Sequence, residues 1–336
     1  MQNKLPKVSI GVPVYNAAKY IERCACSIFM QDYEDLDIVF VDDCSVDNSV
    51  AILEETLKRF PQRKKQTQII RLMKNQGVSV ARNTLIDTFE GEFIVFVDAD
   101  DFLTKNAIDL LISKQKEENS DMVTGKIIMK FSNFEKTIEE PRFNHPEEMM
   151  MHIVSQPANH YNWARLYRKS VIVDNKIRYK MGMHMGEDWL FLVSVVMHLK
   201  VISIINEFVY IYDCTNEESA MHRLANSQVY AKYMLMDLKT LHEIYKLIGN
   251  YGKDYINPLE KMMSQRIEKG LISACKAKDR NTFDLIKNYI SLISPYNIEK
   301  KYLFHKLCFW GSIHPEYYIF YFAIKKVRDK LNGLLN

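Results

Sequence analysis

Three carboxylates stand within four positions, directly after an apolar run of the sequence. Residues 93–97 read Phe-Ile-Val-Phe-Val, and Asp98, Asp100 and Asp101 follow. Such a run is typical of a strand buried on both faces of a parallel sheet, with ligands bound beyond its C-terminal end. Three like charges repel one another unless a cation or hydrogen-bond donors lie among them. The spacing therefore predicts a Mg²⁺ or Mn²⁺ site, because such ions bind one or two carboxylates together with a substrate diphosphate.

Capping of the next helix is the simpler explanation of these acids, since aspartate often caps helices. Thr104 could cap that helix by itself, so capping does not account for all three acids. Two acidic pairs occur elsewhere: Asp42-Asp43 follows the apolar residues 38–41, and Glu187-Asp188 enters an apolar helix. The second pair could simply complement the helix dipole.

The elements that must position these acids alternate between strands and helices. We expect strands at residues 8–14, 37–41, 68–72 and 93–97, separated by helices at 17–30, 50–60 and 78–89. This alternation predicts right-handed crossovers and a parallel sheet. Gly77, just before the helix 78–89, permits a tight turn with a positive φ.

The composition indicates a globular protein of about two domains, with 336 residues and 47% hydrophobic content. Lysine and arginine number 45 against 42 acidic residues, so the net charge of +3 gives no overall case for nucleic acid. Six cysteines without a Cys-x-x-Cys pair favour a reducing compartment and no structural zinc. The sequence shows neither a signal peptide nor an apolar run of ~20 residues, so we expect a cytoplasmic protein.

Four segments follow one another along the first third of the chain: residues 8–16 (Val-Ser-Ile-Gly-Val-Pro-Val-Tyr-Asn), 38–45 (Ile-Val-Phe-Val-Asp-Asp-Cys-Ser), 75–83 (Asn-x-Gly to Ala-Arg-Asn) and 96–101 (Phe-Val-Asp-Ala-Asp-Asp). Together they resemble the bacterial family 2 glycosyltransferases of the GT-A fold. The resemblance covers the first third of the chain densely. It implies an α/β fold with a Rossmann-like, mostly parallel sheet flanked by helices. It also implies a nucleotide-sugar donor and a transfer that inverts the anomeric centre.

The resemblance further implies roles for individual residues. Asp100 would ligate Mn²⁺ or Mg²⁺, and Asp188 would be the catalytic base. The donor, expected to be a UDP-sugar, would be bound by Pro13, Tyr15, Asp42, Gly77, Arg82, Asp98 and His222. In this set, Pro13 and Tyr15 would lie along the base, and Asp42 would hydrogen-bond the base or ribose. Asp98 would hold the ribose. His222 lies where the family has a mobile loop over the diphosphate, and an ordinary surface loop is the alternative.

The chain departs from the family pattern at three positions. Cys44 stands where the family more often has glycine, which bears on the local turn. Within residues 162–169, Ala164 and Arg165 replace the asparagine and lysine of a segment that typically reads Trp-Asn-Lys-Leu-Tyr. Arg165 keeps the positive charge, so it could contact the acceptor or belong to a solvated basic turn.

Two other protein classes stay open. A sugar-nucleotide pyrophosphorylase also combines an α/β fold with Mg²⁺. It needs a glycine-rich loop after the first strand, however, and residues 13–16 read Pro-Val-Tyr-Asn. A catalytically inactive nucleotide-sugar-binding protein is the other class. The presence of Asp98, Asp100 and Asp188 argues against it, because losing one of them would be the simplest route to inactivity.

Residues 1–223 are predicted to form the nucleotide-sugar-binding domain, and residues 224–336 a helical C-terminal extension. Repeating apolar positions such as Met234, Leu238 and Leu241 indicate helices that pack on one another or on the first domain. Residues 314–330 join an aromatic cluster to a basic one, which is compatible with peripheral membrane contact, a homodimer interface or core packing. Membrane contact at the inner face would bring the enzyme to a glycan or lipid-linked acceptor in surface polysaccharide synthesis.

Overall fold

The computed structural model describes residues 5–156, 160–183, 185–215, 227–276 and 279–293. The chain divides into two compact units, Met1–Glu217 and Glu218–Asn336, which are described separately below. The domain boundary predicted at residue 223 lies outside the described residues and stays a prediction.

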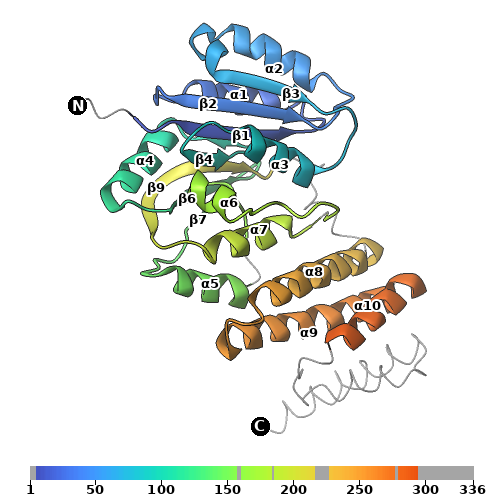
Figure 1. Ribbon diagram of the computed structural model, residues 1–336. Coiled ribbons are helices and arrows are strands. Elements are labelled where there is room, and N and C mark those ends of the chain that lie inside the picture. The colour runs from blue at the N-terminus through green and yellow to red at the C-terminus, as the bar shows by residue number, and fades with distance from the viewer. Residues whose placement is uncertain (1–4, 157–159, 184, 216–226, 277–278, 294–336) are drawn as a thin grey trace. The chain divides into compact units, whose positions relative to one another are not determined.

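The first unit is a sheet with helices packed around it (Figure 1). Its strands are β1 (Val8–Val14), β2 (Leu36–Asp42), β3 (Thr67–Arg71), β4 (Phe93–Phe96), β5 (Phe102–Leu103), β6 (Met122–Lys130), β7 (Glu135–Ile138), β8 (Arg165–Arg168) and β9 (Ile202–Asp213). Its helices are α1 (Ile21–Phe29), α2 (Ser49–Lys58), the 3₁₀ helix η1 (Pro61–Gln66), α3 (Val78–Thr88), α4 (Ala107–Glu118), α5 (Pro146–Ser155), α6 (Lys169–Asp174) and α7 (Glu187–Val196).

The strands of the described residues form one sheet in the order β3-β2-β1-β4-β8-β6-β9-β5, with β7 paired to β6. The first four strands run parallel, as the alternating sequence predicts. Beyond them, β8 is antiparallel to both β4 and β6, whereas β9 is parallel to β6. The predicted α/β fold with a Rossmann-like parallel half is confirmed. The sequence does not predict β8, because four residues are too few to show a strand periodicity.

The strands β1 and β4 are buried on both faces. Val8, Ile10 and Val12 belong to a hydrophobic cluster that includes side chains of α1, α2 and α4. On the opposite face, α3 packs so closely that a Cβ built at Gly11 would lie 2.3 Å from the ring of Phe89. With both faces covered, the carboxyl edge of the parallel strands is the place for polar residues.

The three acids that follow β4 lie in a short turn between two strands. The N–H of Asp101 donates to the carbonyl of Asp98 at 3.0 Å, and β5 then pairs antiparallel with β9. The turn is therefore fixed by the sheet on both sides. A strand of two residues leaves no pattern in the sequence, so β5 could not be predicted.

Arg165 is buried inside the first unit, so the interpretation as a solvated turn is wrong. It lies in β8 with no exposed surface and forms an ion pair with the buried Glu140. Its guanidinium carbon also lies 4.5 Å from the ring centroid of Tyr161. Because Arg165 has no exposed surface, it also cannot contact an acceptor in this structure. Residues 133–146 are largely exposed, but they include the buried Glu140 that pairs with Arg165.

The second unit contains three described helices, α8 (Ser227–Ile248), α9 (Lys253–Lys276) and α10 (Arg280–Ile293). Met234, Leu238 and Leu241 of α8 are buried, in agreement with the predicted packing of these helices on one another. Pro258 lies inside α9, beyond its first turn. Because proline has no backbone N–H, α9 lacks the hydrogen bond that residue 258 would otherwise donate one turn back.

The C-terminal segment with the aromatic and basic clusters lies outside the described residues. The membrane and homodimer contacts predicted for this segment therefore stay predictions. Among the helices that the structure describes, none is long and apolar enough to cross a membrane.

Replacing Gly91 by alanine is expected to destabilise the first unit. A Cβ at this position would lie 2.5 Å from the backbone nitrogen of Ser9 and 2.8 Å from the carbonyl oxygen of Lys7. Paired backbone cannot move aside cheaply, so we expect a loss of about 3 kcal/mol in the free energy of unfolding. Urea unfolding measures this loss. The exposed Glu90→Ala serves as the control, expected within about 0.5 kcal/mol of the native protein. A Gly91→Ala protein of native stability would contradict the close approach of Gly91 to the backbone of Lys7 and Ser9.

Candidate active site

The carboxyl ends of β1, β2 and β4 bring the predicted donor-binding residues to one edge of the sheet. Val14 pairs with Asp42 in the parallel register of β1 and β2, and Asp98 follows β4 on the other side of β1. Pro13 lies at the end of β1, and the ring of Tyr15 just beyond it is 51% exposed. An exposed aromatic ring at this edge is available to stack on a ligand.

Asp42 closes the turn at the end of β2. Its two carboxylate oxygens accept from the backbone N–H of Ser45 at 3.2 and 3.3 Å. Within this turn Cys44 has a φ of 62°, a left-handed conformation that favours glycine. The family's usual glycine at this position therefore has a conformational reason, and this chain forms the same turn with cysteine at some cost in strain.

Asp43 connects the end of β2 to the start of α3. This buried side chain accepts from the N–H of Gln76 at 2.8 Å and from the N–H of Gly77 at 2.7 Å. Gly77 has a φ of 88°, so the positive φ allowed by its sequence position is observed. Together these contacts fix the first turn of α3 and hence the position of Arg82, one turn further along.

Arg82 joins acids from two separate parts of the chain. Only 4% of its surface is exposed, and its Nη2 donates to Asp98 Oδ1 at 2.9 Å. Its Nη1 donates to Asp188 Oδ1 at 2.5 Å and to Glu187 Oε1 at 3.4 Å. The guanidinium carbon also lies 5.3 Å from the ring centroid of Tyr179. A buried cation thus holds the acid after β4 and the acids that begin α7 beside one another.

The environment of Asp188 raises the pKa of its carboxyl group to about 7. Burial is the largest cause, and the negative charges of Glu187 and Asp98 act in the same direction. The positive charge of Arg82 and a hydrogen bond from Asn162 lower the pKa and so oppose the effect. A carboxyl group with a pKa near neutrality is well suited to accept and release a proton.

Asp101 has a structural role, whereas Asp98 and Asp100 keep exposed surface. It is fully buried, and its oxygens accept from the hydroxyl of Tyr210 at 2.7 Å and the N–H of Asp213 at 2.9 Å. Burial and the charges of Asp100 and Asp98 raise the pKa of Asp101 well above its usual range. Both anchors belong to β9, so Asp101 fixes the turn that carries Asp98 and Asp100.

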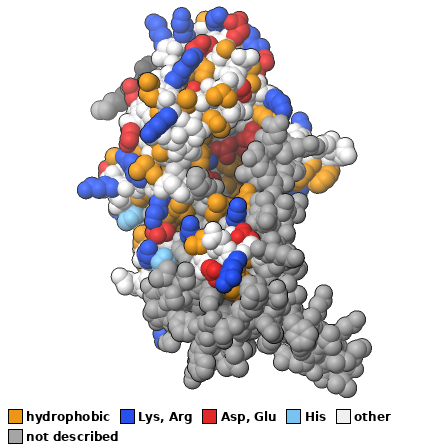
Figure 2. Space-filling view, turned by 90° about the vertical axis from the view of Figure 1, so that its right-hand side faces the viewer, with side chains coloured by type: hydrophobic (Ala, Val, Ile, Leu, Met, Phe, Trp, Pro, Cys, Tyr) orange, Lys and Arg blue, Asp and Glu red, His pale blue; other side chains and the backbone are white. Residues whose placement is uncertain are grey.

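The acids of this turn fit a hard divalent cation. Asp98 and Asp100 are partly exposed, and acidic side chains gather in a recess on one face of the molecule (Figure 2). Among the described residues, no group of three or more His, Cys, Asp or Glu side chains forms a metal site by itself. A Mg²⁺ ion would not require such a group, because it takes one or two carboxylates and completes its shell with water and substrate phosphates.

Three residues of this region are not singled out by the sequence: Asn162, Tyr179 and Tyr210. Asp43 is visible in the sequence only as part of the acidic pair with Asp42, and Asn162 only as the start of residues 162–169. The two tyrosines look like ordinary core residues. His222, predicted to bind the donor, lies outside the described residues.

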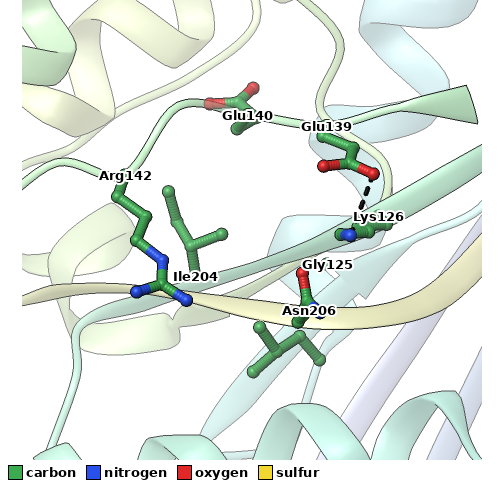
Figure 3. A pocket seen from close by; sticks show the side chains of 8 residues that line it. Gly125, Lys126, Glu139, Glu140, Arg142, Ile204 and Asn206 are labelled. Carbon is green, nitrogen blue, oxygen red and sulfur yellow. Dashed lines mark ion pairs between the residues drawn. The ribbon is translucent and has the colours of Figure 1, made fainter.

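A polar pocket of about 110 Å³ lies elsewhere in the first unit, where the pairing of β6 and β9 is irregular (Figure 3). An ion pair between Lys126 and Glu139 at 2.9 Å borders it. The pocket contains none of the predicted site residues, and its volume is well below that of pockets for nucleotide-sized ligands. This pocket is therefore separate from the candidate site at the carboxyl edge of the parallel strands.

Sequence comparison identifies relatives along most of the chain. The poly(ribitol-phosphate) beta-N-acetylglucosaminyltransferase TarP of Staphylococcus aureus (strain N315) is 29% identical over 266 residues, covering 78% of this chain and 76% of TarP. The uncharacterized glycosyltransferase YibD of Escherichia coli (strain K12) is 28% identical over 264 residues, covering 75% of this chain and 74% of YibD.

Two solved structures share the fold. S. aureus TarS in complex with UDP-GlcNAc superposes with a TM-score of 0.63 at 19% identity, covering 84% of this chain and 80% of the other. The mannosyltransferase PcManGT from Pyrobaculum calidifontis, in complex with GDP-Man and Mn²⁺, gives a TM-score of 0.54 at 15% identity and covers 98% of this chain and 89% of the other. The sequence model described as glycosyl transferase family 2 matches residues 9–198, more than half of the chain. The chain therefore belongs to glycosyl transferase family 2 and has the GT-A fold.

Proposed function

We propose that this protein is an inverting, metal-dependent glycosyltransferase that moves a sugar from a UDP-sugar to a hydroxyl group of a surface polymer. The observation that carries this proposal is the contact of one buried guanidinium, Arg82, with both Asp98 and Asp188. Asp98 belongs to the edge where the donor would bind, and Asp188 provides a carboxylate beside it.

The chemistry is a single displacement. The acceptor hydroxyl oxygen forms a bond to the anomeric carbon as the bond from that carbon to the nucleotide's phosphate oxygen breaks. The bonding electron pair leaves with UDP, and the hydroxyl proton passes to Asp188. Its carboxylate form, required for this step, is available at neutral pH because the pKa of Asp188 is about 7.

The donor would lie along the carboxyl edge of β1, β2 and β4. We assign Pro13, Tyr15, Asp42 and Asp98 of this edge to donor binding, together with Gly77 and Arg82 at the start of α3 and with His222, which lies outside the described residues. Tyr15 offers an exposed ring for the uracil base, and Asp98 offers a partly exposed carboxylate for the ribose hydroxyls.

Asp100 is the residue that we assign to a bound Mn²⁺ or Mg²⁺. When bound, such an ion offsets the negative charge that develops on the leaving diphosphate. The hydrogen bonds that Asp101 accepts from Tyr210 and Asp213 keep the turn that carries Asp100 in place.

The names of the relatives suggest the acceptor. TarP is a poly(ribitol-phosphate) beta-N-acetylglucosaminyltransferase, and a Bacillus spizizenii relative, 29% identical over 61% of this chain and 32% of its own length, is a poly(ribitol-phosphate) beta-glucosyltransferase. We therefore propose a polyol-phosphate or glycan polymer as the acceptor. We also propose that residues 1–223 are the catalytic domain. A β-linked product from an α-linked UDP-sugar also requires inversion.

Asp188→Asn is expected to separate donor binding from catalysis. The amide cannot take the hydroxyl proton, so kcat should fall roughly 10²–10⁴-fold while the affinity for UDP stays nearly native. Glu187→Gln, in the neighbouring acid of the same helix turn, is the matched control and should lose less than about tenfold. UDP release and calorimetry measure the two quantities. Native turnover in Asp188→Asn would remove this residue from the mechanism.

Chelation is expected to weaken nucleotide binding. Like-charge repulsion between the diphosphate and the acids after β4 should make UDP bind at least about tenfold more weakly after EDTA treatment, and added Mn²⁺ or Mg²⁺ should restore the affinity. Asp100→Ala should abolish the restoration, whereas Asp109→Ala, a change in α4, should not. Equal UDP affinity by calorimetry with and without metal would contradict the metal site.

A further inference from the structure

Two hydrogen-bond donors converge on the same oxygen of Asp188. Arg82 Nη1 lies 2.5 Å from Asp188 Oδ1, and Asn162 Nδ2 lies 2.8 Å from that atom. Within the part of the chain that the structure describes, no hydrogen bond reaches Oδ2. The carboxylate is also partly open, since 24% of the side-chain surface is exposed. The two oxygens of this acid therefore have different environments.

Asn162 is held firmly enough to impose this asymmetry. It is 1% exposed, and its amide also donates to the hydroxyl of Tyr179 at 3.0 Å. Tyr179 exchanges two hydrogen bonds of 2.8 Å with Asn83, one through its N–H and one through its carbonyl. Its ring stacks on Phe191 of α7 with centroids 4.1 Å apart. Because α7 also carries Asp188, the donor and the carboxylate are fixed to the same group of side chains.

From this geometry we infer that Arg82 and Asn162 are positioning residues that hold Oδ1, so that Oδ2 takes the proton from the acceptor hydroxyl. The inference rests on the proposed function and names the atom at which the proton arrives. The hydroxyl O–H bond breaks as the new bond to the anomeric carbon forms, and the proton forms a bond with Oδ2. Oδ1 keeps both hydrogen bonds throughout, so the carboxyl group need not rotate.

The groups around Asp188 determine in which direction the pKa of its carboxyl group changes when Asn162 is replaced. Arg82 from α3 is the cation that faces it, while Glu187 at the start of α7 and Asp98 after β4 are the acids. The buried hydroxyls of Tyr179 and Tyr167 also face it. A donor to the charged form lowers the pKa of a carboxyl group, so loss of Asn162 must raise the pKa of Asp188.

The test compares Asn162→Ala with Asn162→Asp by two readouts. The first is the ¹³C NMR titration of the Asp188 carboxyl group in the full-length protein, assigned through Asp188→Asn. The second is the pH dependence of kcat with UDP-GlcNAc and oligo(ribitol phosphate). We expect the titration midpoint to rise by about one pH unit in Asn162→Ala, as for one charge-assisted hydrogen bond. The acidic limb of kcat should move upward by the same amount, because the base must be ionised.

The aspartate variant separates positioning from packing. Asn162→Asp keeps the side-chain volume, removes the donor to Asp188 Oδ1 and adds a negative charge beside it. Loss of the hydrogen bond and like-charge repulsion together predict a larger upward shift than in Asn162→Ala. A packing role predicts the reverse order. Unchanged midpoints in both folded variants would overturn the inference, whatever the activity. A midpoint that rises while the kcat profile stays in place, or absence of transfer by the native protein, would instead overturn the role of Asp188 as base.

Discussion

The buried guanidinium of Arg82 is the constraint on which the site depends. A cation with 4% of its surface exposed is stable only beside acids, and here it lies among Asp98, Glu187 and Asp188. The same contacts bring the end of β4 and the start of α7 together, although more than eighty residues separate them in the sequence. Removing one partner of a buried ion pair typically lowers the free energy of unfolding by about 3–5 kcal/mol, because the other charge is left buried without its counterpart. Electrostatic neutralisation of one side chain thus determines where Asp98, Glu187 and Asp188 lie.

The rest of the fold supplies the positions from which Arg82 works. The parallel strands place Tyr15, Asp42 and Asp98 at one edge, and Asp43 fixes the first turn of α3. On the far side of the acidic turn, β9 provides the two donors that hold Asp101. The acids of one short segment therefore divide their roles. Asp101 is fully enclosed and structural, whereas Asp98 and Asp100 keep exposed surface, as the proposed donor and metal sites require.

The strongest local patterns predict the parallel half of the fold and the acids at its edge. Continuous apolar runs ending in Asp42 and Asp98 allow this, since burial on both faces leaves a clear pattern. Residues whose roles depend on distant partners could not be found in this way. Arg165 looks like a surface residue until Glu140 folds back on it, and Asn162 gains its role only through Tyr179 and α7. Short strands such as β5 and β8 carry too few residues to show a period.

The stereochemistry of transfer tests the central claim most directly, because an acceptor activated by Asp188 must attack opposite the leaving UDP. The measurement is the ¹H NMR spectrum of the product formed from UDP-GlcNAc and oligo(ribitol phosphate) in the presence of Mn²⁺, after removal of the paramagnetic ion. We predict a β-linked product, recognised by the large coupling between the protons on C1 and C2 of the new glycoside. An α-linked product would show retention and would contradict direct attack on the anomeric carbon.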